Sequence, residues 1–241
     1  MSTFAAMGSI FRFKEFEVNQ QGCAMKINTD GVLLGATVDA NNPTRILDIG
    51  TGTGVIAMML AQRFPDAQVD AVEIDEEAYK TSLKNFQNSP FQARIQGYFG
   101  SFEEMQSSVP YDIIVSNPPF YTNSLHNPDS RKKLARHTDF DFFNKLLVFA
   151  QEKLTHNGQL ELILPGELAE YVIEHGHAMG LHLRKTISIR SFADSEVIRN
   201  LVSLGKNSVE STIKDDFIIY EEKGVYSADY RRVLKPFFLA F

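Results

Sequence analysis

The sequence has one cysteine, no tryptophan and no apolar run of the ~18 residues that a membrane-spanning helix requires. Cys23 alone cannot form an internal disulfide, which is consistent with a reducing compartment. The residues before Arg12 include no Lys or Arg and no long apolar segment, so we expect no secretory signal. These absences predict a cytoplasmic protein with no membrane segment.

An excess of positive charge is also lacking, since the net charge of -6 excludes a chain that is basic overall. The two signs are nevertheless segregated along the sequence. An acidic stretch contains Asp66, Asp70, Glu73, Asp75, Glu76 and Glu77. Basic residues gather elsewhere, at Arg131, Lys132, Lys133 and Arg136 and at Arg184, Lys185, Arg190, Arg199 and Lys206. Such clusters are often solvated surface, but their segregation favours a polyanionic substrate.

The 241 residues, 44% hydrophobic and 22% charged, fit one globular domain. We expect an N-terminal hairpin extension at 1–44 and an α/β core at 45–241. Alternation of strands and helices in the core predicts a doubly wound, mostly parallel, seven-stranded sheet of Rossmann-like type, with antiparallel C-terminal edge strands. In such a sheet a ligand binds outside the carboxyl ends of the strands.

Individual elements follow from hydrophobic periodicity and from turn residues. In the extension, 11–18 alternates like a half-buried strand, 24–27 can pair back on it, and Thr29-Asp30-Gly31 caps a helix. We expect core strands at 45–48, 68–73, 94–97, 111–116 and 158–164, an antiparallel pair at 181–190 and 201–219, a loop at 121–138, and helices ending at Phe64 and spanning 75–88, 139–154, 167–179 and 226–236.

The core opens with Ile46-Leu47-Asp48-Ile49-Gly50-Thr51-Gly52-Thr53-Gly54, which reads as a strand followed by a glycine turn and the start of a helix. Such a turn aims backbone N–H groups and a helix N-terminus at a ligand. A P-loop is excluded because no Lys lies between Arg45 and Lys80. A dinucleotide fingerprint remains open, since Gly52, Gly54 and Ala57 satisfy G-x-G-x-x-A and Glu73 follows about 20 residues on. A ligand-free turn is the remaining alternative.

A further interpretation treats Asp48-x-Gly50-x-Gly52-x-Gly54 as one motif. This motif resembles the first motif of class I S-adenosylmethionine (SAM) methyltransferases. A carboxylate at the strand end suits the sulfonium and ammonium of SAM and repels a pyrophosphate. We therefore expect Asp48 to face solvent at the ligand.

A second motif, Asn117-Pro118-Pro119-Phe120, follows the strand at 111–116. Two prolines make a stiff arm, in which Asn117 Oδ1 and the Pro118 carbonyl can both accept hydrogen bonds from a planar NH2 group. Phe120 offers a face for stacking a ring. The arm resembles the (N/D/S)-P-P-(Y/F/W) motif of amino methyltransferases. A dinucleotide-binding site offers no role for this motif. A rigid turn without chemistry is the other interpretation.

The resemblance narrows with three further stretches, Met25–Ala36, Ala135–Thr138 and Tyr230–Leu239. Together with the arm, they are similar to the bacterial tRNA adenine-N6 methyltransferases, which modify the adenosine 3′ of the anticodon of a valine tRNA. The resemblance implies an enzyme that uses SAM as cofactor and tRNA as substrate. The departure from the superfamily pattern is Gly100-Ser101-Phe102, where an Asp for the cofactor adenine is usual.

The motifs, the resemblance and the clusters of basic residues together predict the site residues. The catalytic set is Asn117, Pro118, Pro119 and Phe120. The cofactor set is Lys26, Thr29, Asp30, Asp48, Gly50, Gly52, Gly54, Glu73, Asp75, Ser101, Phe102 and Asn117. The RNA set, expected as one track from the hairpin past the arm to the C-terminal edge strands, is Arg12, Lys14, Arg131, Lys132, Lys133, Arg136, Arg184, Lys185 and Arg190.

Other functions remain as alternatives at this point. An rRNA guanine-N2 methyltransferase or a protein glutamine-N5 methyltransferase would use the same arm, and a SAM- or nucleotide-binding module would use only the turn. Metal chemistry is not expected, because His175 and His177 point away from each other on a helix. We expect a monomer.

Overall fold

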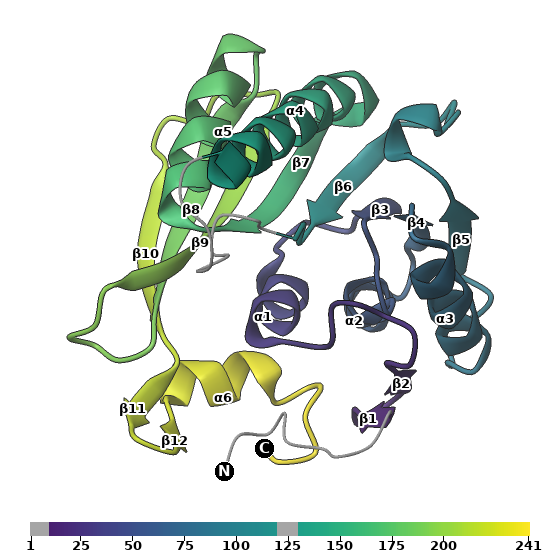
Figure 1. The fold of residues 1–241 in the computed structure, drawn as a ribbon. Coiled ribbons are helices and arrows are strands. Elements are labelled where there is room, and N and C mark those ends of the chain that lie inside the picture. The colour runs from purple at the N-terminus through teal and green to yellow at the C-terminus, as the bar shows by residue number, and fades with distance from the viewer. Residues whose placement is uncertain (1–9, 120–129) are drawn as a thin grey trace.

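The structure is a computed structural model that describes residues 10–119 and 130–241, with the side chains of 10–119 and 140–241. In these ranges one large sheet contains eight strands in the order β10-β8-β9-β7-β6-β3-β4-β5 (Figure 1). The strands are β3 (Arg45–Ile49), β4 (Gln68–Glu73), β5 (Ile95–Phe99), β6 (Tyr111–Ser116), β7 (Leu154–Leu164), β8 (His182–Arg190), β9 (Val197–Gly205) and β10 (Ile213–Ile218).

Most neighbouring strands are parallel, as predicted, and β9 is the exception because it pairs antiparallel with both β7 and β8. The prediction of seven strands was wrong, since 201–219 contains the end of β9 and all of β10, separated by a polar segment. The antiparallel strand is also internal, whereas the edge strand β10 runs parallel to β8. The mostly parallel α/β class is confirmed.

Helices cover both faces of the sheet, as a doubly wound fold requires (Figure 1). One apolar core joins the sheet to α1 (Thr29–Thr37), α2 (Val55–Arg63), α3 (Glu76–Gln87) and α6 (Ala228–Leu234). The other core joins it to α4 (Ser130–Lys153) and α5 (Gly166–Ala178). No helix among the described residues is long and apolar enough to cross a membrane.

The N-terminal hairpin is shorter than expected. β1 (Ile10–Arg12) pairs antiparallel with β2 (Glu17–Asn19), and the Phe13 N–H donates to the Phe16 carbonyl at 2.8 Å to close the turn. Residues 24–27 form no strand. The single strand predicted at 11–18 was wrong, because the chain turns between Phe13 and Phe16. The apolar residues of this stretch, Phe11, Phe13, Phe16 and Val18, are all buried.

The hairpin packs against the C-terminal end of the chain, where the short hairpin of β11 (Tyr220–Glu222) and β12 (Val225–Tyr226) precedes α6 (Figure 1). Phe13 forms a β-bridge with Phe238, and their ring centroids lie 5.7 Å apart. The Lys14 Nζ donates to the carbonyls of Lys235 at 2.6 Å and Phe241 at 2.8 Å. The ammonium of Lys14, assigned to RNA from the sequence, therefore stabilises the contact between the two ends of the chain.

The segment after the arm differs from the prediction. A loop was predicted to continue to Thr138, but α4 begins at Ser130. Its first turns contain Lys, Leu, Ala and Arg, which are strong helix formers, and this local preference outweighs the density of charge. Phe120 and the side chains of Arg131, Lys132, Lys133 and Arg136 lie outside the described residues.

Candidate cofactor and substrate site

The carboxyl ends of β3, β4 and β6 meet at one rim of the sheet, as predicted. These strands are adjacent and parallel, with Ile49 paired to Val72 on one side and to Ser116 on the other. The Ser116 hydroxyl also donates to the Ile49 carbonyl at 2.8 Å. The glycine turn after β3, the acidic end of β4 and the arm after β6 are therefore neighbours.

The three glycines of the turn all have positive φ, at 71° for Gly50, 56° for Gly52 and 83° for Gly54. They differ in their surroundings. A Cβ on Gly54 would lie 2.3 Å from the ring of Phe86, so this glycine permits close packing of α3. A Cβ on Gly50 would meet no atom within 4 Å, and one on Gly52 only the Gly50 carbonyl at 4.0 Å. The first two glycines thus border open space that a ligand can enter.

Asp48 is fully buried, so the expectation that it faces solvent was wrong. Its Oδ2 accepts hydrogen bonds from the Thr51 hydroxyl at 2.6 Å and from the Ala57 N–H at 3.1 Å, which ties β3 to the turn and to the first turn of α2. Burial raises the pKa of this carboxyl to about 7, against the opposing effect of the Thr51 hydrogen bond. Its Oδ1 is buried and has no partner among the described residues.

Glu73 holds the same turn from the end of β4. Its Oε2 accepts from the Gly52 N–H at 2.8 Å and its Oε1 from the Asp75 N–H at 2.9 Å. Asp75 then caps α3, since its Oδ1 accepts from the Ala78 N–H at 2.8 Å. Two acidic side chains predicted at the cofactor therefore fix the backbone that surrounds the open space.

Ile74, between these two acids, is 72% exposed, and the sequence analysis missed it. An aliphatic residue in this position presents an apolar surface at a rim made largely of carboxylates and backbone amides. The detectable signal was an isolated Ile between Glu73 and Asp75.

The arm places Asn117, half-buried, beside the first turn of α1. A Cβ on Gly31 would lie 3.5 Å from Asn117 Nδ2 and 3.6 Å from Asn28 Oδ1. Asn28, rather than Thr29-Asp30-Gly31, is the N-cap, and its Oδ1 accepts from the Gly31 N–H at 2.9 Å. Pro118 is buried and Pro119 is exposed.

Asp30 was predicted at the cofactor, and its Oδ2 lies 2.7 Å from the Nε of Arg199 on β9. Arg199 was absent from the predicted site, because no local pattern relates residues so far apart in the sequence. Lys26 is exposed, and Thr29 is the first residue of α1.

Ser101 and Phe102 follow β5 at the same rim. The Ser101 hydroxyl accepts from the Glu103 N–H at 3.3 Å and caps a short 3₁₀ turn. Phe102 is buried, and its ring meets Phe142 and Phe149 edge-on, so its side chain belongs to the core beneath α4.

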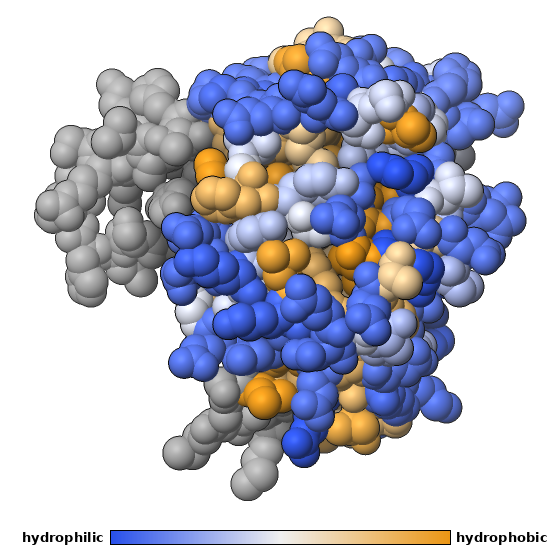
Figure 2. All heavy atoms as spheres, turned by 90° about the vertical axis from the view of Figure 1, so that its right-hand side faces the viewer, coloured by the Kyte–Doolittle hydropathy of each residue, from blue (hydrophilic) through white to orange (hydrophobic). Residues whose placement is uncertain are grey.

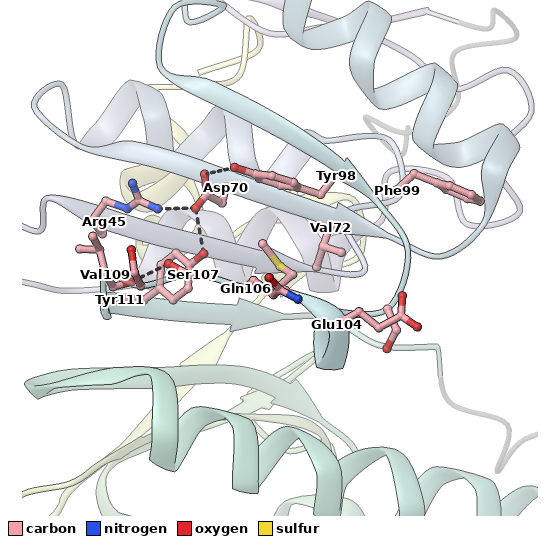
Figure 3. A pocket seen from close by; sticks show the side chains of 13 residues that line it. Arg45, Asp70, Val72, Tyr98, Phe99, Glu104, Gln106, Ser107, Val109 and Tyr111 are labelled. Carbon is pink, nitrogen blue, oxygen red and sulfur yellow. Dashed lines mark hydrogen bonds and ion pairs between the residues drawn. The ribbon is translucent and has the colours of Figure 1, made fainter.

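A cavity of about 450 Å³ extends from Ser101 along the face of β4, β5 and β6 (Figure 3). It exists because the connection from β5 to β6 contains only this 3₁₀ turn, whereas parallel crossovers usually contain a covering helix. At one end Asp70 accepts from Arg45 at 2.6 Å and from the Tyr111 hydroxyl at 2.8 Å, and burial raises the pKa of Tyr111 to about 12.

At its other end the cavity reaches the exposed ring of Phe99. The glycine turn, Asp48, Glu73 and Asn117 do not line it. The face of the molecule shown in Figure 2 is mainly hydrophilic, with apolar surface in several separate patches.

The remaining residues of the predicted RNA set do not share one edge. β8 lies inside β10, so the expectation that Arg184, Lys185 and Arg190 occupy an edge strand was wrong. Since β8 runs parallel to β7, Arg190 lies at the carboxyl rim and Arg184 toward the opposite end. Arg190 meets Asp216 at 3.4 Å, and Arg184 donates to the Asn157 carbonyl at 3.2 Å. Arg12 forms an exposed ion pair with Glu17 at 2.9 Å.

Metal ligands do not gather at the rim. Within 10–119 and the described side chains of 140–241, no group of three or more His, Cys, Asp or Glu residues is placed to hold a metal ion.

Comparison with known proteins gives consistent matches. The family model of the methyltransferase small domain matches residues 23–173. A tRNA1(Val) (adenine(37)-N6)-methyltransferase of Pedobacter heparinus is 47% identical over 235 residues, covering 98% of this chain and 100% of that protein. One of Christiangramia forsetii with the same name is 38% identical, covering 95% and 97%. The crystal structure of a predicted O-methyltransferase from Agrobacterium tumefaciens aligns with a TM-score of 0.64 at 20% identity, covering 86% of this chain and 96% of that one, and so shares the fold.

Proposed function

Because the chain belongs to the family of tRNA1(Val) (adenine(37)-N6)-methyltransferases, we propose that it transfers a methyl group from SAM to N6 of the adenosine 3′ of the anticodon in a valine tRNA. The observation that carries the proposal is the position of Asn117 and Pro118 at the rim where the glycine turn leaves open space. An acceptor pair for an NH2 group thereby lies next to a site for a methyl donor.

The residues of the turn fit SAM on two counts. The buried Oδ1 of Asp48 has no partner among the described residues, so a cationic ligand group would satisfy it. Gly50 and Gly52 border space that any larger residue would fill. Glu73 holds Gly52 and Asp75 with one lone pair of each oxygen, and the second pairs are available to ribose hydroxyls. Ile74 offers an apolar surface for the adenine, with Ser101 and Lys26 as further polar contacts of the cofactor.

When bound, SAM supplies a methyl group on a sulfonium, and transfer from it depends on alignment more than on acid–base catalysis. Adenine N6 is a weak nucleophile because its lone pair is delocalised into the ring. Acceptance of its two hydrogens by Asn117 Oδ1 and the Pro118 carbonyl would localise that pair toward the methyl group. The two prolines keep these acceptors in place, since their φ angles are fixed near -65°.

The target base must leave the stack of the anticodon loop, at a cost of a few kcal/mol. Stacking on Phe120 would offset about 1–3 kcal/mol of that cost. Arg131, Lys132, Lys133 and Arg136 lie in the first turns of α4, the first helix after the arm, and Arg190 lies at the same rim. We assign tRNA phosphates to these residues, because phosphate contacts position a substrate and do not select its sequence.

Parallel incubations with each candidate substrate test the proposal. The protein and methyl-labelled SAM are mixed with unmodified bulk tRNA in one sample, with rRNA in another and with a peptide-release factor in another. The labelled product of each sample is digested and identified by mass spectrometry. We expect N6-methyladenosine in valine tRNA alone. Label in rRNA guanine or in protein glutamine, with none in tRNA, would contradict the proposed substrate. No label in any sample, with SAM bound, would indicate a binding module.

A further inference from the structure

The first turn of α1 is held to the sheet by an ion pair between Asp30 and Arg199. The Arg199 Nε lies 2.7 Å from Asp30 Oδ2, and only 26% and 21% of the two side chains is exposed. The pair joins positions 169 residues apart. Partial burial separates it from fully exposed pairs, which often contribute nothing measurable to stability. It is therefore a contact that can fix a distance between two elements.

Both partners come from well-fixed backbone. Arg199 stands in β9 opposite Ile189 of β8, and its neighbour Asn200 pairs with Leu164 at the end of β7. Since β9 runs against its neighbours, its first residues lie at the carboxyl rim that also carries Asn117. Asp30 is the acidic residue in the first turn of α1, where the helix dipole favours a negative charge.

That first turn lies beside the arm. A Cβ added to Gly31, one residue after Asp30, would lie 3.5 Å from Asn117 Nδ2, so the Gly31 backbone and the Asn117 amide are separated by about the space of one methyl group. The Asn28 carboxamide, which caps the helix by accepting from the Gly31 N–H, lies on the same side. Any displacement of the turn would therefore alter the space that the Asn117 side chain occupies.

We propose that Arg199 is a positioning residue of the methyl transfer, which acts through Asp30 to hold the start of α1 against Asn117. This inference rests on the proposed function. It gives Asp30 a role different from direct cofactor binding, and it gives Arg199 a role different from RNA binding. Both residues then keep Asn117 oriented toward N6 of the target adenine.

The test compares Arg199→Ala, Arg199→Lys, Asp30→Asn and the double variant Asp30→Asn/Arg199→Ala. We expect each alanine or asparagine variant to lower kcat about tenfold, because small misplacements of a reacting group are costly. The dissociation constant of SAM and KM for tRNA should change less than about twofold. The double variant should be no worse than either single one, since both remove the same contact, and Arg199→Lys should recover part of the loss. Arg232→Ala, which breaks the exposed pair with Asp229 at 2.8 Å, is the matched control.

Other outcomes contradict the positioning role in distinguishable ways. A rise in KM for tRNA with Arg199→Ala alone would make Arg199 an RNA contact. Weaker SAM binding with Asp30→Asn alone would make Asp30 a cofactor contact. Additive losses in the double variant would show that the two side chains act separately. If the wild-type protein does not methylate tRNA, the proposed function fails instead.

A readout independent of activity is hydrogen exchange of the amides at 31–34, which should be faster in Arg199→Ala and unchanged in Arg232→Ala. Unchanged exchange in Arg199→Ala would overturn the inference, whether or not the protein is active.

Discussion

The rim of the sheet has two halves, the proposed cofactor half and the proposed target half, that are held together differently. In the cofactor half, Asp48 and Glu73 accept hydrogen bonds from Thr51, Ala57 and Gly52, all within 21 residues of them. In the target half, Asn117 lies against α1, which Arg199 holds from 169 residues away. The cofactor half is thus a local structure built into one β-α-β segment, whereas the target half is assembled from three distant parts of the chain.

The largest effect should come from breaking the cofactor half at Gly54. Gly54→Ala places a Cβ 2.3 Å from the Phe86 ring at a φ of 83°, so we expect a loss of about 2–5 kcal/mol in the free energy of unfolding. Gly50→Ala is the matched variant, with positive φ but no atom within 4 Å. It should lose about 1–2 kcal/mol, the cost of left-handed backbone, and should bind SAM more weakly. Denaturant titration measures both, and equal losses would contradict this distinction.

A smaller effect should come from the protonation of Asp48, which makes the free energy of unfolding depend on pH. Its folded-state pKa of about 7 lies above the value of 3.8 for an ordinary Asp carboxyl, so the native state retains a proton that the unfolded chain loses. The free energy of unfolding should therefore fall as pH rises from about 4 to about 7. Asp48→Asn keeps an acceptor for Thr51 and Ala57 and removes this dependence.

We expect the stability of Asp48→Asn relative to wild type to increase by at least ~1 kcal/mol across that window. Glu161→Gln is the control, because burial also raises the pKa of Glu161 to about 7. Each variant should remove only the part of the pH dependence that its own carboxyl contributes. A constant difference between Asp48→Asn and wild type at all pH values would mean that Asp48 is ionised throughout.

The sequence allowed the cofactor half to be predicted in most of its elements. The strand at 45–48, the glycine turn, the strand at 68–73 and the helix at 75–88 all follow from local periodicity and turn chemistry, and the structure confirms them. The family resemblance was confirmed as well. The prediction that was wrong there was the solvent exposure of Asp48, because the burial of a side chain depends on the helix that packs over it.

The target half was less predictable, for a physical reason. Asn117 could be placed at a strand end, but its contact with the first turn of α1 and the pairing of Arg199 with Asp30 depend on how distant segments pack. The same limit explains why 201–219 was read as one strand and why Lys14 was assigned to RNA. Its two carbonyl partners lie at the far end of the chain.

The most direct test of the division between the halves is to measure SAM affinity and single-turnover methyl transfer on one variant, Asn117→Ala. Its amide belongs to the proposed target half, and within the described residues no hydrogen bond joins it to the glycine turn proposed to hold the cofactor. We expect the dissociation constant of SAM to stay within about twofold of wild type, while the rate of transfer to tRNA falls more than tenfold, a loss above ~1.4 kcal/mol in the transition state. A variant that keeps more than a tenth of the rate, or that loses SAM affinity to the same extent, would contradict this separation.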